Sequence, residues 1–151
     1  MTTQARALKS ILGKRFGVDG YGRAVANGIA LTPKCVDATI TVAAEDTNVR
    51  AITIQLKDAN GNDLDEAAQV RLTVFTNATR QALATGGSTG IAIGTDGTIL
   101  ATHTAKLVFD IMSEADGDID LTWTDIGTES VVLGLLLPNG NWVMSEAFAN
   151  T

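Results

Sequence analysis

Residues 49–76 read VRAITIQLKDANGNDLDEAAQVRLTVFT and contain the strongest structural signals of the chain. Over residues 49–57, apolar and polar side chains alternate, which is typical of a half-buried β-strand. The same alternation returns over residues 69–76. Between the two, residues 58–63 contain an Asn-Gly pair, a strong turn signal because both residues accept positive φ. The stretch therefore predicts two strands joined by a turn.

Strand and turn signals continue on both sides of this stretch, at spacings of about 8–12 residues. No long helical pattern occurs after residue 38. Short strands at this spacing are typical of an antiparallel sandwich of the immunoglobulin type. We therefore predict an all-β fold, an immunoglobulin-like antiparallel β-sandwich over residues 38–151 preceded by an extended N-terminal arm over residues 1–37. The further strands are expected at residues 39–42, 91–93, 98–102, 105–113, 119–124, 129–137 and 142–145.

The run VVLGLLL at residues 131–137 is apolar on both faces. Such a strand lies in the centre of a sheet, or has one face covered by a partner. It is far shorter than the ~20 residues that cross a bilayer, and the N-terminus lacks the apolar core of a secretion signal, so we expect no membrane association. Trp123 shares a face with Ile119 and Leu121 and is expected in the core. Trp142 follows a tight turn and is expected at a rim or an interface.

The predicted arm differs from the rest of the chain in charge. Residues 1–34 contain six Lys/Arg and one acidic residue, whereas residues 35–151 contain five Lys/Arg and sixteen acidic residues. The whole chain has a formal net charge of −6. A solvated basic arm on an acidic folded body indicates a protein that attaches to a larger assembly.

The arm offers isolated apolar side chains on a glycine-rich backbone. The sequence QARALKSIL favours a short helix over residues 4–12, but a helix of this length is marginal in water and needs a partner surface. Glycines then alternate with apolar residues, which suits a chain lying extended on another protein. The alternative is irregular coil packed on the chain's own body. We predict partner binding, through Arg6, Leu8, Ile11, Lys14, Arg15, Phe16, Tyr21 and Arg23.

The basic residues of the arm leave three interpretations. They form an ordinary solvated tail, they bind nucleic acid, or they meet an acidic protein surface. Six charges without interleaved aromatic side chains bind nucleic acid only weakly and with strong salt dependence. Because Arg pairs well with carboxylates, we favour an acidic protein surface over nucleic acid as the partner.

Residues that usually carry catalysis or metal binding form no recognisable site in the sequence. Cys35 is the only cysteine, so no intrachain disulfide forms, and we expect it to be a buried small apolar residue. His103 is the only histidine, lacks an accompanying G-x-S-x-G elbow, and is expected at the surface or in a loop. One Cys and one His exclude a typical zinc site. We therefore predict a non-enzymatic protein with no cofactor and no metal.

Of all the motifs in the sequence, the acidic turns most resemble a cation-binding site. Residues 58–69 begin like a calcium-binding EF-hand loop, but glycine and glutamate are missing from its sixth and twelfth positions. Asp116, Asp118 and Asp120 alternate along a turn and a strand. We interpret these three as solvated residues that also discourage edge-to-edge pairing of strands. A weak cation site is the alternative left open.

Four strand-and-turn motifs stand out in the predicted sandwich. They are AITIQLKDANGNDL at residues 51–64, GTDGTIL at 94–100, SEADGDIDLT at 113–122 and LLPNG at 136–140. With these motifs, residues 50–148 resemble small β-sandwich proteins encoded among the virion genes of tailed bacteriophages. The resemblance implies a non-enzymatic structural component, a capsid decoration (cement) protein or a base for fibres. One departure is the stretch VRLTVFTNATR at residues 70–80, which lacks an acidic turn after the strand, so the loop 77–90 is expected to have its own role.

The arm and the resemblance together predict a virion structural protein, assembled in the cytoplasm of the bacterial host. Its arm is expected to bind the major capsid protein or another virion protein. Because one arm gains little beyond the cost of ordering it, we also expect multivalent attachment or a homo-oligomer joined through residues 131–137. The alternative is a tail- or fibre-associated module that binds a receptor or a carbohydrate through loops 77–90 and 138–142. Removal of residues 1–34 is expected to leave the sandwich folded and to abolish assembly.

Overall fold

The computed structural model describes residues 16–85 and 88–151, and every regular element within them is a β-strand. The helix predicted over residues 4–12 lies outside the described residues. In the described part, no helix has the length and apolar character needed to span a membrane. The strands are β1 (Phe16–Val18), β2 (Ala24–Ala26), β3 (Ile29–Ala30), β4 (Asp37–Val42), β5 (Val49–Lys57), β6 (Gln69–Phe75), β7 (Gly90–Ile93), β8 (Thr98–Thr104), β9 (Val108–Met112), β10 (Asp118–Thr124), β11 (Val132–Leu136) and β12 (Trp142–Met144).

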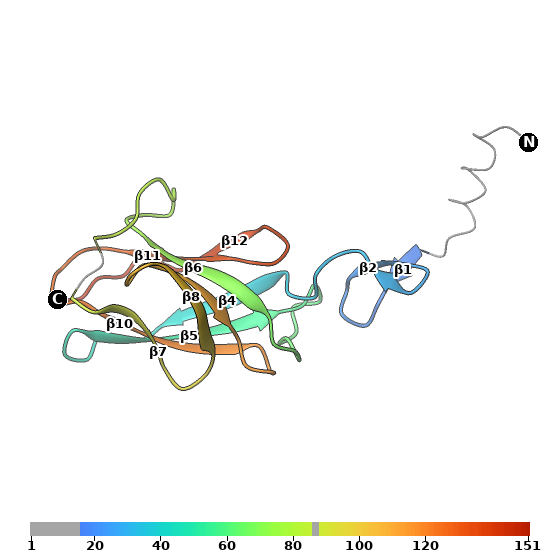
Figure 1. Cartoon of the computed structure of the whole chain (residues 1–151), viewed down its shortest axis with the longest axis horizontal. Helices are drawn as coiled ribbons and strands as arrows, with labels where there is room; N and C mark the ends of the chain where they lie inside the picture. Colours follow the sequence, from blue (N-terminus) through green and yellow to red (C-terminus); the bar gives the residue numbers. More distant parts are fainter. Residues whose placement is uncertain (1–15, 86–87) are drawn as a thin grey trace, which may run out of the picture.

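Two antiparallel sheets face each other as a sandwich, in the orders β4-β5-β10-β7 and β12-β11-β6-β9-β8 (Figure 1). Strands β4, β5 and β10 are neighbours in one sheet, and β6, β11 and β12 in the other. Strands A, B, E and C, F, G of an immunoglobulin domain have these same neighbour relations. The predicted immunoglobulin-like antiparallel sandwich is therefore confirmed. A third sheet, β1-β2-β3, projects from one end of the sandwich (Figure 1).

The core lies between the two sandwich sheets, because alternation along each strand points its apolar side chains inward. The register of β5 and β10 pairs Ile54 with Ile119 and Ile52 with Leu121, and all four residues are at most 2% exposed. Trp123, the next inward residue of β10, is fully buried, as predicted. The opposite sheet supplies the inward residues Val70, Leu72, Val74, Phe109, Ile111, Leu133 and Leu135.

Strand β11 is apolar on both faces because the chain itself packs against both of them. It lies between β6 and β12, which agrees with the predicted central position. On its outer face, Phe75 and Trp142 pack edge to face, with ring centroids 5.6 Å apart. The two rings meet over Gly134, where an added Cβ would lie 2.8 Å from Phe75 Cε2 and 3.1 Å from Trp142 Cζ3. Glycine at this position thus makes room for an aromatic pair outside the main core.

The Asn-Gly turn after β5 folds only a short piece of chain back on that strand. The N–H of Leu64 donates to the carbonyl of Leu56 at 2.9 Å, and the carboxylate of Asp58 accepts the N–H of Asn60 at 2.8 Å. The chain then crosses to the opposite sheet, so β5 and β6 do not pair with each other. A strong local turn signal therefore does not determine which strands become partners.

Residues 31–34 connect the projecting sheet to the sandwich. Strand β4 begins at Asp37, and Cys35 belongs to the core, as expected of a small apolar residue. Burial, with smaller contributions from Asp37 and Glu66, raises the pKa of the Cys35 thiol to about 11. The thiol therefore stays protonated at neutral pH and is a poor nucleophile.

Candidate interaction surface

The projecting sheet, residues 16–31, is a small meander whose turns are set by local sequence. Between β1 and β2, the carboxylate of Asp19 accepts hydrogen bonds from the backbone N–H groups of Tyr21 (2.9 Å) and Arg23 (3.0 Å) and from Arg23 Nε (2.7 Å). Burial acts to raise the pKa of Asp19, but these hydrogen bonds outweigh it and lower the pKa. Between β2 and β3, Asn27 and Gly28 have φ values of 54° and 79°, as a type I′ hairpin turn requires.

One face of the meander is apolar across all three strands. The backbone pairing forms two rows across the sheet, Phe16–Ala26–Ile29 and Val18–Ala24–Leu31. Residues two apart along a strand point to the same side, so both rows lie on one face. We call the four large side chains of these rows the apolar face. Phe16, Val18, Ile29 and Leu31 are 64%, 71%, 70% and 57% exposed, respectively.

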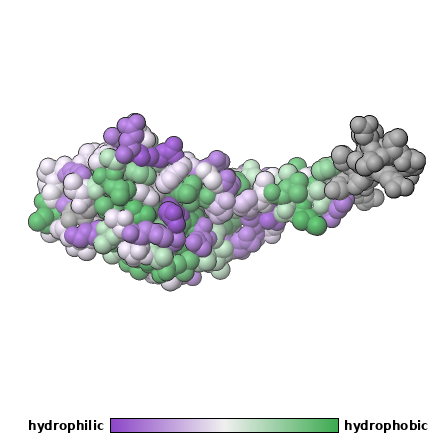
Figure 2. Space-filling model, turned by 45° about the horizontal axis from the view of Figure 1, so that its top comes forward, coloured by the Kyte–Doolittle hydropathy of each residue, from purple (hydrophilic) through white to green (hydrophobic). Residues whose placement is uncertain are grey.

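The apolar face accounts for most of the exposed large hydrophobic residues among those that the structure describes. The other three, Leu83, Leu100 and Ile126, lie on separate parts of the sandwich. Figure 2 shows hydrophobic atoms gathered on the narrow projecting part, beside the body. Single exposed apolar residues are normal, but a contiguous exposed group is a candidate interaction surface.

Tyr21 ties the meander to the sandwich. Its carbonyl accepts the N–H of Ala59 at 3.2 Å, and its ring centroid lies 3.6 Å from Lys34 Nζ. The buried Lys34 in turn pairs with Asp65 and, at 3.6 Å, with Glu66. Burial acts to lower the pKa of Lys34, but the two carboxylates and Tyr21 outweigh it and raise the pKa. Because this polar cluster holds the meander in place, the apolar face is not needed for that purpose.

The predicted arm residues fall into three groups. Phe16 belongs to the apolar face. Tyr21 and Arg23 contact the chain's own residues, since Tyr21 lies against Lys34 and Arg23 pairs with Asp19. The remaining five lie outside the described residues: Arg6, Leu8, Ile11, Lys14 and Arg15.

The predicted set of partner-binding residues omits Val18, Ile29 and Leu31, although a signal for them was present. Apolar residues alternate with small ones over the three short strands, and Asn27-Gly28 is the same hairpin pair that indicates a turn after β5. The surrounding glycines, considered alone, indicate an irregular chain and hide this alternation.

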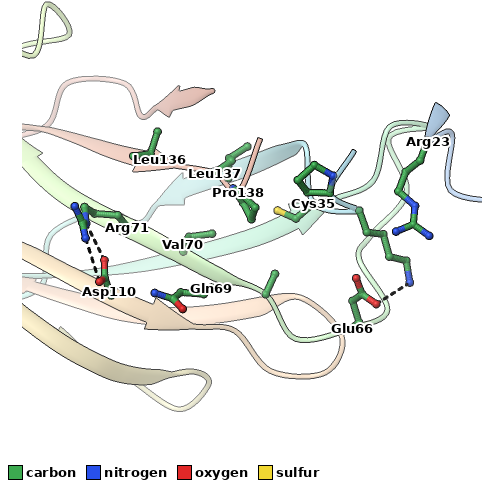
Figure 3. Close-up of a pocket in the computed structure, with 13 residues that line it drawn as sticks. Arg23, Cys35, Glu66, Gln69, Val70, Arg71, Asp110, Leu136, Leu137 and Pro138 are labelled. Atoms are coloured by element: carbon green, nitrogen blue, oxygen red, sulfur yellow. Dashed lines mark hydrogen bonds and ion pairs between the residues drawn. The ribbon is translucent and has the colours of Figure 1, made fainter. Parts of the chain in front are cut away.

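A groove of about 710 Å³ runs from the root of the meander along the outer face of the five-stranded sheet (Figure 3). Leu136, Leu137 and Pro138 form an apolar side of it. Arg23 lies at the meander end, and Arg71 and Asp110 lie where the groove meets the sheet (Figure 3). The groove thus continues the surface of the meander onto the body.

Asp110, on β9, is held ionised by two neighbours. Arg71 Nε donates to Asp110 Oδ1 at 2.8 Å, and His103 Nε2 lies 2.8 Å from Asp110 Oδ2. The hydrogen bond from Arg71, and then that from His103, lowers the pKa of Asp110 to about 2. His103 is at the surface, as predicted, on strand β8.

We expect Arg71→Gln to lower the free energy of unfolding slightly at neutral pH, because solvent screens a guanidinium side chain that is 45% exposed. The folded pKa of Asp110 is about 2 and its ordinary value is 3.8. The pair therefore stabilises the fold above about pH 4, and this contribution is lost as the pH falls toward 2. Urea unfolding measures the difference in the free energy of unfolding between the natural protein and Arg71→Gln. This difference should be about half as large at pH 3 as at neutral pH. A difference independent of pH contradicts this account.

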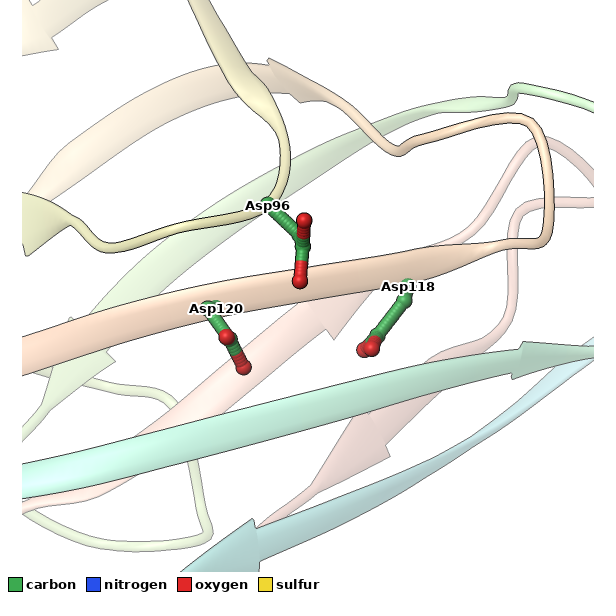
Figure 4. A group of neighbouring side chains, drawn as sticks. All are labelled: Asp96, Asp118 and Asp120. Atoms are coloured by element: carbon green, nitrogen blue, oxygen red, sulfur yellow. The ribbon is translucent and has the colours of Figure 1, made fainter.

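Asp96, Asp118 and Asp120 bring carboxylate oxygens within 4.8 Å of one another (Figure 4). Asp96, from the loop between β7 and β8, takes the place that the sequence suggested for Asp116. Asp118 and Asp120 lie on β10 beside β5, and on the other side of β10 the backbone of Asp120 bonds to Gly94 and Asp96, so edge protection does not explain Asp120. Burial, together with the neighbouring acids, raises the pKa of Asp96 and of Asp118. Nothing else in the described residues points to an ion at this position.

No protein-family model matches the chain, and neither does any curated protein. Among solved structures, the chain is similar to a β-glucuronidase of Parabacteroides merdae, in two crystal structures, one of them with glycerol in the active site. Each superposition has a TM-score of 0.45 at 13% sequence identity. They cover 89% and 90% of this chain but only 15% and 16% of the enzyme. A likeness at this level carries no inference about activity.

Proposed function

We propose that the chain is a non-enzymatic structural protein of a tailed-bacteriophage virion, a capsid decoration (cement) protein that attaches through its N-terminal residues. The observation that carries this proposal is the apolar face, four large and mostly exposed side chains on a meander that projects from the sandwich (Figure 1). The partner is the major capsid protein or another virion protein. The resemblance of the sandwich motifs to virion proteins supports the same assignment.

The meander suits attachment because it is already folded before it meets a partner. An unstructured segment loses about 1–2 kcal/mol of backbone freedom per residue when it becomes ordered. Residues 16–31 do not incur this cost on binding, since their turns and strand pairing already hold them. Each apolar side chain that becomes fully buried then stabilises the contact by about 1.5–3 kcal/mol. Pre-organisation of this kind raises affinity without adding contacts.

The apolar face is too small to hold a partner alone. It consists of two rows of side chains across three short strands. The area that it can bury is therefore well below the ~800 Å² per partner of a standard interface. Several attachments on a symmetric shell raise the total affinity without any new contact. We therefore propose that several copies act together, as a homo-oligomer or as an array on the capsid.

A matched pair of isoleucines tests the proposal. Ile29, on the apolar face, is 70% exposed, and Ile126, on the sandwich, is 77% exposed. We expect Ile29→Asp to weaken attachment about 10- to 100-fold, because it places a charge where an apolar side chain becomes buried. Ile126→Asp should leave attachment unchanged. Co-sedimentation with shells assembled from the major capsid protein of the same phage measures both.

Both isoleucines are exposed, so neither substitution should alter urea unfolding. This separates a binding defect from a folding defect. Undiminished co-sedimentation of the Ile29→Asp variant, or an equal loss for both variants, would refute attachment through the apolar face.

A further inference from the structure

Arg80 forms no ion pair within the part of the chain that the structure describes. Its guanidinium carbon lies instead 5.2 Å from the centre of the Trp142 ring. Arg50 also lacks an ion pair among the described residues, but its guanidinium donates to the backbone carbonyls of Ala43 and Ala149. A guanidinium presents its N–H donors as a planar fork that matches the two oxygens of a carboxylate. Arg80 is therefore a cation available to an external carboxylate.

The backbone around Arg80 holds its side chain over the indole. Arg80 has a φ of 61°, in the left-handed region, which is unfavourable for a residue with a side chain. The turn is fixed by Asn77, whose side-chain oxygen accepts the N–H of Thr79 at 2.9 Å and whose carbonyl accepts the N–H of Arg80 at 3.3 Å. The position of the guanidinium thus follows from a defined turn of the loop after β6.

The indole of Trp142 is held by its neighbours in the sheet and is partly buried. Phe75 packs against it edge to face, and the missing side chain of Gly134 lets it lie close to β11. An aromatic ring held in this way is a rigid apolar platform whose polar edge stays near water. The C–H-bearing face of a pyranose ring is a flat apolar surface of similar size, so it can stack on such a platform.

Trp142 lies between two hollows of different character. One, of about 460 Å³, is lined by Phe75, Thr79, Arg80 and Trp142. The other, of about 710 Å³, is lined by polar residues of several loops together with Trp142, among them Asp37, Asn139 and Asn141. The side-chain amide of Asn141 makes no hydrogen bond to the described residues, so it can meet a hydroxyl group. The platform thus has a cation at one end and amide and carboxylate groups at the other.

We propose that this surface binds an acidic sugar, with the carboxylate of the sugar on Arg80, its ring against the part of the Trp142 indole that Arg80 and Phe75 leave open, and its hydroxyl groups toward Asn141. Asp37, on the far side, fixes the orientation, because a carboxylate placed there would meet a like charge. Residues from both loops named for carbohydrate binding in the sequence contribute to the site, Thr79 and Arg80 from one and Asn139, Asn141 and Trp142 from the other. The site is separate from the apolar face and does not depend on the attachment function.

The two tryptophans make a direct test possible. Trp123 is fully buried in the core, so a ligand-induced change in emission reports on Trp142. We expect D-galacturonate to change the emission saturably, with a Kd on the order of 1 mM for a ligand of this size. D-Galactose, which lacks the carboxylate, should bind at least about tenfold more weakly. Acetate, which lacks the ring, should produce no saturable change.

Two arginine variants distinguish binding at this site from a general effect of positive charge on the protein. Arg80→Gln should lose the preference for galacturonate over galactose. Arg71→Gln removes the same charge from an exposed arginine that has no aromatic contact, and it should keep the preference. Trp142→Ala should abolish binding in calorimetry while the protein remains folded by circular dichroism. The proposal is overturned if galacturonate gives no saturable change, if galactose or acetate matches it, or if both arginine variants behave alike.

Discussion

Replacing Gly134 with valine should lower the free energy of unfolding by about 3 kcal/mol. A Cβ at this position would lie 2.8 Å from Phe75 Cε2, 3.1 Å from Trp142 Cζ3 and 3.2 Å from Met144 Sδ. The two additional methyl groups of valine would have even less room. Either the aromatic pair must separate or β11 must shift against β6, its neighbour in the sheet. Urea unfolding followed by tryptophan emission measures the loss.

Gly17 provides the control for this substitution. It also lies in a strand, β1, but a Cβ there would have only Val25 Cγ2 within 4 Å, at 3.9 Å. Gly17→Val should therefore be neutral or slightly stabilising, since β-branched residues favour strands. Replacing the opposing ring with a smaller side chain, in the double variant Gly134→Val/Phe75→Leu, should recover part of the lost stability. The reason is that positions 134 and 75 are in direct contact. Equal stability of Gly134→Val and the natural protein would show that the outer aromatic cluster does not constrain β11.

The inner layers of the sandwich could be predicted because they depend on local alternation. Ile52 and Ile54, like Ile119 and Leu121, sit two apart with polar residues between them, and this spacing alone indicates one buried face. Trp123 follows in the same period, so its burial was also predictable. None of these inferences requires knowledge of which strand lies beside which.

Pairing across the chain could not be predicted in this way. The Asn-Gly turn after β5 suggests a hairpin, but β5 pairs with β4 and β10, which are supplied by chain before and after the turn. The acidic group on β10 shows the same limit. Asp96 joins Asp118 and Asp120 because β7 and the loop after it lie beside β10, a non-local relation that the spacing of charges does not contain.

The apolar face shows a different limit of sequence reasoning. Alternation within the meander indicates that one face is apolar, and such a face is usually buried against other parts of the same chain. Here Phe16 and Ile29 remain mostly exposed, because the meander is fixed to the sandwich through Tyr21 and Lys34 instead. The apolar pattern was therefore visible, but only the fold reveals that the described part of the chain leaves it uncovered.

The proposed function predicts that removing residues 1–31 abolishes attachment to the capsid and leaves the sandwich folded. The meander contacts the body through few groups, chiefly the hydrogen bond from Ala59 to Tyr21, the amide of Asn60 on Gly20, and the ring of Tyr21 on Lys34. Losing these three contacts, at about 1 kcal/mol each, should lower the free energy of unfolding by about 3 kcal/mol. The cut leaves Lys34 with its carboxylate partners and keeps Cys35 in the core. Co-sedimentation with capsid shells and urea unfolding measure the two expectations separately.

Tyr21→Ala distinguishes the apolar face from the cluster that supports it. This variant loosens the meander from the sandwich but keeps Phe16, Val18, Ile29 and Leu31, so attachment should weaken far less than in the truncated protein. If the truncated protein still co-sediments with the shells, attachment resides in the sandwich and the N-terminal residues serve another purpose. If Tyr21→Ala and the truncation lose attachment equally, the orientation of the meander, and not its apolar side chains alone, is what the partner recognises.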